Sequence, residues 1–214
     1  MKVVLLIDGG HLRAVSGKAR IEYTPDFIEA FAHSCIDLGE HEKLLRILYY
    51  DCPRYRGKKS KPISGEMHNF QATDTWLEDI AVKNYFAVRR GTLAWRGWQL
   101  KKDPPVTGKA LSDADFRPNF EQKGVDMRIG LDIASISAEK SVDRIILVSA
   151  DTDMIPAMKH ARKSGMQVVG VQLPMPPSIA LTKHFLAHTD FRRSVGWPAE
   201  FQPGSANAAP DEPC

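Results

Sequence analysis

The feature that most constrains the fold is an uninterrupted apolar run at residues 3–7, next to the N-terminus. A strand with one face in water alternates apolar and polar residues, whereas a continuous aliphatic run is typical of a strand buried on both faces. Strands of this kind belong to parallel sheets that helices cover on both sides. The run therefore predicts an α/β fold, and the glycine pair at residues 9–10 predicts a turn directly after the strand.

Further along the chain, apolar strand-like runs alternate with segments of helical spacing. One helix is expected to begin after Thr24 and to stop at Gly39. This alternation predicts a three-layer α/β sandwich around a mainly parallel central sheet. Further strands are expected at residues 44–50, 85–88, 144–149 and 167–171, and further helices at residues 68–82, 125–137, 154–163 and 178–187.

The remaining segments lack these patterns. Residues 52–66, which are rich in Pro, Gly and Lys, are expected to form a loop, as are residues 103–118. Residues 91–102 predict a two-stranded ribbon that turns at Gly97. The C-terminal stretch is rich in Pro, Ala and Gly and has little to bury. We therefore expect one domain over residues 1–195 and a disordered tail over residues 196–214.

The composition is that of an ordinary globular protein. With 214 residues, 43% of them hydrophobic and 26% charged, the chain is long enough for one domain with a sizeable core. Its three cysteines include no C-x-x-C pair, which argues against a thiolate zinc site or a disulfide framework and favours a reducing compartment. The first apolar run is too short for a signal peptide, and no segment approaches the length of a membrane span. A cytoplasmic protein without a membrane partner is expected.

Aspartates gather where strands are expected to end. Asp8 follows the first strand, Asp151 and Asp153 follow the strand at residues 144–149, and Asp126 begins a helix. Functional groups collect at the carboxyl ends of parallel strands, so these acids converge if the two strands are neighbours. Two carboxylates about 4 Å apart repel by roughly 4 kcal/mol at an effective dielectric of about 20. Such a cluster needs protons or a cation, and an all-oxygen set suits Mg²⁺ or Mn²⁺.

Each aspartate also has a simpler possible role. Asp151 or Asp153 is a suitable N-cap for the following helix, and Asp8, before two glycines, is a suitable turn residue. The functional interpretation is favoured because independent segments each place an acid at the same end of the expected sheet.

Two basic segments are expected to border this end of the sheet. One contains Tyr55 among its cations, and the other contains Trp95 and Trp98. Basic side chains neutralise phosphates and aromatic rings stack on unpaired bases, so both are candidates for RNA binding. Solvated charge, and a ribbon that buries its tryptophans, are the alternatives. The candidate cations are Arg54, Arg56, Lys58, Lys59 and Lys61 in the first segment and Arg89 and Arg90 at the start of the second.

Other chemistry finds little support in the sequence. His184 and His188 have the spacing of a zinc pair on a helix, but the glutamate of H-E-x-x-H is absent, so a surface or core role is expected. No dinucleotide-binding glycine motif, Walker loop or nucleophile elbow is present. Serine or cysteine nucleophilic catalysis is therefore not indicated.

Three stretches in this order resemble a known family. "VVLLIDGGHL", "QKGVDMRIGLDIAS" and "DRIILVSADTDMIPAMKHARKSGMQVVGV" are together similar to the bacterial NYN domains of the LabA/DUF88 group, which are relatives of PIN nucleases. The resemblance covers most of residues 2–192. It implies a PIN-like sheet of strand order 3-2-1-4-5, which sets the first and fourth strands side by side. It also implies a ribonuclease that depends on Mg²⁺ or Mn²⁺.

The resemblance also assigns roles to individual residues. The family's acids fall on four aspartates, which are then the expected metal ligands and catalytic residues, and small polar residues beside the last pair are expected to contact the substrate. The acids are Asp8, Asp126, Asp151 and Asp153, and the polar neighbours are Ser149 and Thr152.

Three further positions follow from the same comparison. Lys123 would sit beside the acids and meet a phosphate. The family often has Asn shortly after the first acid, where this sequence has His11, which is then a substitute donor to the substrate. Asp132 matches another family acid, but it lies four residues after Arg128, so a surface ion pair between them is expected.

These features predict a metal-dependent ribonuclease, of endonuclease or RNA-processing type, in which a metal held by the aspartates activates a water molecule. RNA is the expected partner, and a homodimer is left open. The alternative is a weakly active or inactive NYN module that binds RNA or a protein as a regulator. A phosphatase with Asp8 as nucleophile is less well supported, because "DGGHL" contains no second acid.

Overall fold

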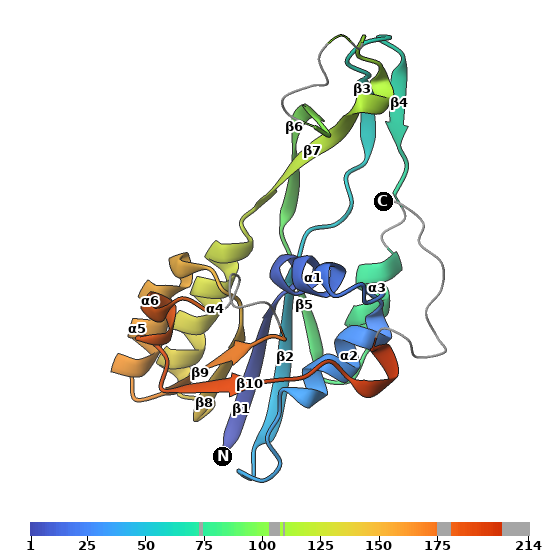
Figure 1. The fold of residues 1–214 in the computed structure, drawn as a ribbon. Coiled ribbons are helices and arrows are strands. Elements are labelled where there is room, and N and C mark those ends of the chain that lie inside the picture. The colour runs from blue at the N-terminus through green and yellow to red at the C-terminus, as the bar shows by residue number, and fades with distance from the viewer. Residues whose placement is uncertain (73–74, 103–107, 109, 175–180, 203–214) are drawn as a thin grey trace.

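The centre of the molecule is a six-stranded sheet in which all neighbouring strands are parallel. The structure is a computed structural model that describes residues 1–72, 75–102, 108, 110–174 and 181–202. In the middle lies β1 (Lys2–Asp8), between β2 (Lys43–Asp51) and β8 (Arg144–Val148) (Figure 1). The outer strands are β5 (Phe86–Arg90) next to β2, then β9 (Gln167–Gln172) and β10 (Phe191–Ser194) beyond β8.

The predicted strand order is confirmed for the five expected strands. In spatial order they are β5-β2-β1-β8-β9, which is 3-2-1-4-5 by sequence. The sheet differs in one detail, because β10 adds a sixth strand beside β9. The sequence of this strand, Phe-Arg-Arg-Ser, has no apolar run and is mostly exposed, so its pattern did not indicate a strand.

Two layers of helices cover the sheet, so the three-layer α/β class is confirmed. Along β1, Val3 and Leu5 pack into one core and Val4 and Leu6 into the other. The first core contains residues of α1 (Gly9–Lys18), α2 (Pro25–Ser34) and α3 (Thr75–Ala81). The second contains residues of α4 (Val125–Glu139), α5 (Ile155–Lys163) and α6 (Lys183–Leu186).

The expected turn at residues 9–10 is wrong, because α1 begins directly at Gly9. A Cβ atom at Gly9 would lie 2.5 Å from the hydroxyl of Tyr49 and 2.8 Å from the carbonyl oxygen of Tyr50. The glycine is therefore needed for the close packing of the helix start against the end of β2, rather than for a change of chain direction.

Other helices differ from expectation in extent. The first half of the expected helix at residues 68–82 contains the end of a strand, β4 (Met67–Phe70), and the described residues of this range are helical only in α3. Helix α2 ends at Ser34, before Gly39. A 3₁₀ turn, Thr152–Met154, precedes α5. Helix α6 covers only the later part of the expected helix at residues 178–187, of which residues 178–180 lie outside the described part of the chain.

Two antiparallel ribbons extend beyond the carboxyl ends of the central strands (Figure 1). One pairs β3 (Gly57–Ser60) with β4, and the other pairs β6 (Thr92–Leu100) with β7 (Phe116–Lys123). We call residues 53–70, 92–102 and 110–123 the arm. A short 3₁₀ turn, Asp113–Asp115, precedes β7.

The loop and ribbon expected in this region are corrected accordingly. Residues 57–60 of the expected loop form a strand, and β6 does not turn at Gly97. Gly97 has a positive φ of 97° and lies where the pairing register shifts between Trp95 and Trp98. It therefore marks a bulge within the strand. The partner strand β7 begins within the expected loop at residues 103–118 and continues to Lys123.

The expected domain boundary at residue 195 is too early. Trp197 packs against Phe27 and Phe31, with ring centroids 5.9 and 6.0 Å apart, and Phe201 lies 5.6 Å from Phe27. A 3₁₀ turn, Ala199–Phe201, carries the second ring to the core. These two aromatic residues give the start of the expected tail something to bury, and residues 203–214 lie outside the described residues.

A buried ion-pair network fastens the amino ends of the strands. The Glu42 carboxylate accepts hydrogen bonds from Arg144 Nη1 at 2.6 Å and from Arg193 Nη2 at 2.8 Å. The side chain of Glu42 is 0% exposed and that of Arg144 is 3% exposed. The network therefore joins the start of β2 with β8 and β10, although β10 pairs directly with neither of these strands in the sheet.

We expect Glu42→Gln to lower the free energy of unfolding by about 3–5 kcal/mol at neutral pH, because it removes one partner of a buried ion pair. Burial alone favours the neutral acid, but hydrogen bonds from Arg193 and Arg144 hold the pKa of Glu42 below its ordinary value. The stabilisation is therefore fully present above that ordinary value and is lost as the pH falls through the lower pKa of the folded state. Urea unfolding of both proteins between pH 7 and pH 3 measures the difference.

Glu22→Gln is the matched control, because Glu22 is exposed, and its effect should stay within about 0.5 kcal/mol. A deficit of Glu42→Gln that stays constant down to pH 3 would contradict the role of the charge.

Candidate active site

Asp8 lies at the carboxyl end of β1 and caps α1. Its Oδ1 accepts the backbone N–H of His11 at 3.0 Å, and the hydroxyl of Ser149 donates to its Oδ2 at 3.3 Å. Burial raises the pKa of Asp8, and the neighbouring charge of Asp51 raises it further, while these two hydrogen bonds lower it. Asp8 is thus the N-cap of α1 rather than the turn residue that the sequence suggested as its simpler role, and it is also a buried acid that contacts Ser149 at the end of β8.

The end of β8 places a second set of acids beside it. The backbone N–H of Asp151 donates to Ser149 Oγ at 3.2 Å, and that of Asp153 donates to Asp151 Oδ1 at 2.9 Å. Asp151 is therefore the N-cap of the 3₁₀ turn before α5, which confirms the capping alternative for this residue. Asp153 and Thr152 are exposed.

Asp126 reaches the same region from α4. It lies in the first turn of this helix, after Gly124, whose positive φ of 76° turns the chain from β7 into the helix. Burial raises the pKa of Asp126, followed by the charges of Asp151, Asp8 and Asp153. All four predicted acids therefore lie in one electrostatic neighbourhood.

The chemistry of these acids fits a hard divalent ion, but their arrangement is not that of a finished metal site. All four offer carboxylate oxygens, the ligands that Mg²⁺ and Mn²⁺ prefer. Within the described residues, however, no three His, Cys, Asp or Glu side chains are grouped so that they could hold one ion as they stand. An ion would therefore have to be held after the exposed acids reorient.

A fifth acid, Asp51, lies at the end of β2, and the sequence analysis missed it. Its side chain is 1% exposed and forms an ion pair with Arg13. Its oxygens also accept the Tyr49 hydroxyl at 2.9 Å, the Cys52 N–H at 2.7 Å and the Gln122 amide at 3.2 Å. The rule that selected Asp8, an acid directly after a buried strand, applies equally to Asp51 and was the available signal.

The Asp51 network ties three elements together. Arg13 comes from α1, where its guanidinium lies 5.1 Å from the ring centroid of Tyr23 and 5.6 Å from that of Trp76. The Tyr23 hydroxyl donates to the carbonyl of Gly9 at 3.1 Å, at the start of the helix that Asp8 caps. The network therefore holds the first turn of α1, and with it Asp8, against the end of β2.

Several predicted substrate contacts are engaged within the protein. Lys123 pairs with Glu121. Arg89 Nε donates to Asp132 at 2.9 Å, so the expected pairing of Asp132 with Arg128 is wrong. Asp132 also accepts the Tyr50 hydroxyl at 2.8 Å, and Arg128 donates instead to the carbonyl of Gly124 at 2.9 Å.

The other predicted contacts lie around the acids and along the arm. Burial lowers the pKa of His11, so its imidazole is neutral at pH 7. Lys59 Nζ lies 5.8 Å from the ring centroid of Trp95, inside the arm. Arg54, Arg56, Lys58 and Arg90 are exposed.

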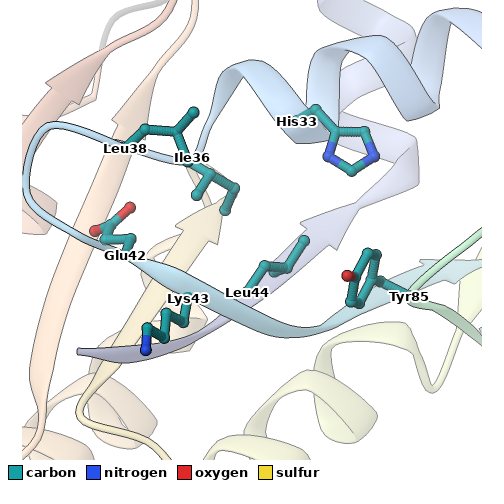
Figure 2. Close-up of a pocket in the computed structure, with 7 residues that line it drawn as sticks. All are labelled: His33, Ile36, Leu38, Glu42, Lys43, Leu44 and Tyr85. Atoms are coloured by element: carbon teal, nitrogen blue, oxygen red, sulfur yellow. The ribbon is translucent and has the colours of Figure 1, made fainter.

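Two other features lie apart from the acids. His184 and His188 face each other with ring centroids 5.4 Å apart, and no described acid or cysteine completes a metal set with them. An open cavity of about 440 Å³ lies between the end of α2 and the start of β2, lined by residues such as Ile36, Leu44 and Tyr85 (Figure 2). It is at the amino ends of the strands, so it is not part of this site.

Comparison with known proteins identifies the family. A family model described as NYN domain matches residues 2–188, most of the chain. The chain belongs to the NYN domain family. NYN domains are members of the PIN-like nuclease superfamily, which places the chain in a nuclease-type family.

Among solved structures, this NYN domain is similar to VPA0982 from Vibrio parahaemolyticus RIMD 2210633, a protein of unknown function. The TM-score is 0.51 at 15% identity, over 90% of this chain and 91% of that one, which supports the fold alone. No curated protein matches the chain. None of the helices in the described ranges is long and apolar enough to cross a membrane.

In metal-free buffer, Asp151→Asn should lower the pKa of Asp126, because Asp151 is the strongest of the charges that raise it. Asparagine caps a helix as well as aspartate does, so the local structure should survive. A pH titration of carboxyl ¹³C shifts measures the change, with Asp79→Asn on α3 as the control. If the pKa of Asp126 is the same in Asp151→Asn as in the unmodified protein, the charges of Asp126 and Asp151 do not interact.

Proposed function

We propose that this NYN domain is a metal-dependent ribonuclease of endonuclease or RNA-processing type. The observation that carries the proposal is that acids from two other segments, the end of β1 and the segment after β8, raise the pKa of Asp126 on α4 at the carboxyl edge of the sheet. Keeping like charges together is unfavourable unless protons or a cation compensate. The membership of the chain in a nuclease-type family supports the same conclusion.

Asp8, Asp126, Asp151 and Asp153 would hold Mg²⁺ or Mn²⁺. When bound, such an ion supplies an activated water and offsets the charge of the scissile phosphate. The protein itself orients the acids. Ser149 bridges Asp8 and the backbone of Asp151 through its single hydroxyl, so a shift of either strand end moves both acids.

A second function, RNA binding without cleavage, is favoured by one observation. In the described residues the acids are not assembled into a group that could hold an ion. A domain of this kind would keep the arm and its cations, and would bind RNA as a regulator without cutting it. Sensitivity of cleavage to EDTA separates the two functions.

Asp153→Asn should reduce cleavage by at least about tenfold. Mutating a residue that only orients a metal ligand already costs roughly tenfold to a hundredfold, so loss of a ligand should cost no less. Its side chain is exposed, so the fold should be unaffected. The assay incubates purified protein with single-stranded and structured RNAs in Mg²⁺, Mn²⁺ or EDTA. Asp79→Asn, an exposed acid on α3, should cleave as the unmodified protein does. Undiminished cleavage by Asp153→Asn would falsify this assignment.

Stability provides a test that needs no substrate. Free Mn²⁺ at a hundredfold excess over its Kd should raise the free energy of unfolding by about 2.7 kcal/mol. Asp151→Asn should be more stable than the unmodified protein in EDTA, because it removes a repelled charge, and should gain less from Mn²⁺. If Asp151 serves only as a cap, thermal melts of both proteins in EDTA and in Mn²⁺ will coincide.

A further inference from the structure

The arm carries the positive charge of the molecule. It contains ten Lys and Arg and four Asp and Glu, a net charge of +6. The other described residues have a net charge of zero. A basic projection on a body without net charge attracts a polyanion to one place rather than to the whole surface.

The arm is built as one unit. Rings from both ribbons pack together, with Phe70 and Trp95 centroids 5.6 Å apart and Tyr55 and Phe120 centroids 5.2 Å apart. Trp98 Nε1 donates across the ribbons to the carbonyl of Ser60 at 2.7 Å. The charges on its surface therefore stand on a fixed frame rather than on a loop.

The base of the arm is fixed beside the acids. The backbone N–H of Gly91 donates to the carbonyl of Asp51 at 2.8 Å. A Cβ atom at Gly91 would lie 2.8 Å from Cys52 Sγ and 2.9 Å from the carbonyl of Lys123. Three of the four points where the arm joins the rest of the molecule thus meet at the end of β2, next to the Asp51 network.

One row of cations lies along the outside of this frame. From residue 54 to residue 59, exposure alternates: Arg54, Arg56 and Lys58 are exposed, whereas Tyr55 and Lys59 face the rings of the arm. The last cation of the row, Lys58, lies on the strand β3, and alternate residues of a strand are about 6.6 Å apart on one face. This repeat is comparable to the spacing of successive phosphates along an extended RNA strand.

The tryptophans are not available for the same task. Trp95 and Trp98 pack edge to face, with centroids 5.3 Å apart, and Trp95 also contacts Phe120 at 5.4 Å. They stabilise the arm, as the alternative interpretation of the ribbon held. Recognition by this arm therefore uses the phosphate backbone rather than the bases.

We propose that Arg54, Arg56 and Lys58 form a phosphate-binding row that leads a single RNA strand along the arm to the acids at the sheet edge. The proposal rests on the proposed function for its choice of RNA. Because the contacts are to phosphates, binding should depend strongly on salt and little on base sequence.

The test is the triple variant R54A/R56A/K58A in an Asp153→Asn background with EDTA, so that RNA stays intact. Fluorescence anisotropy with a labelled single-stranded 20-nucleotide RNA gives Kd from about 50 to 200 mM salt. Loss of three contacts should reduce the slope of log K against log salt by about 2, and should weaken binding on the order of a hundredfold at 0.1 M salt.

The matched control is K140A/K159A/K163A, which removes the same charge from exposed positions at the end of α4 and on α5. It should leave the slope unchanged. The proposal is overturned if the two triple variants behave alike, if the arm variant keeps the unmodified slope, or if a duplex of the same length binds as tightly as the single strand.

Cleavage assays with Asp153 restored separate this proposal from the nuclease assignment. If the unmodified protein binds RNA but cuts none, and the arm variant loses binding, the phosphate-binding proposal is supported and the nuclease assignment fails. If the unmodified protein cuts RNA, and the arm variant cuts and binds RNA equally well, the phosphate-binding proposal is refuted and the nuclease assignment is supported.

Discussion

The parallel pairing of β1 with both β2 and β8 is the constraint on which the rest of the structure depends. Because neighbouring parallel strands run in the same direction, their carboxyl ends must lie at one edge of the sheet. Asp8, Asp51 and Ser149 are therefore neighbours although they are far apart in sequence. The arm also begins at this edge, since its ribbons follow β2 and β5. One pairing choice thus determines where acids, buried hydrogen bonds and basic surface meet.

Concentrating acids at one edge has an electrostatic cost that the fold distributes. Asp51 is compensated by Arg13 and is fully buried, so it acts as a fixed structural ion pair. Among the described residues, no cation contacts Asp8, which is held by hydrogen bonds, and burial raises its pKa. Asp126 and Asp153 remain near water. The acids therefore range from Asp51, whose charge is neutralised by Arg13, to the exposed Asp126 and Asp153. A bound cation would stabilise the exposed acids most.

Sequence patterns could predict what depends on local burial. The apolar runs gave the central strands, and acids after two of them gave most of the site. Asp51 satisfies the same rule but was not predicted, because the Cys-Pro segment that follows it has the composition of a loop. The partner of β6 could not be found locally: Gly97 looks like a turn, and only pairing with the distant β7 shows that it is a bulge. The packing of Trp197 against Phe27 was likewise not predicted, because the Pro-rich residues around Trp197 indicate an unstructured tail.

The arm is held together by its own rings, and its four strands contain no buried residue. Segments with little buried apolar surface open locally at a lower free energy than the core does. We therefore expect the arm to open at a lower free energy than the sheet, which can remain native while the arm is unfolded. Under partial denaturation the acids at the sheet edge would stay in place after the basic surface of the arm is lost. Heat or denaturant would therefore remove RNA binding by the arm before it disrupts the acid cluster.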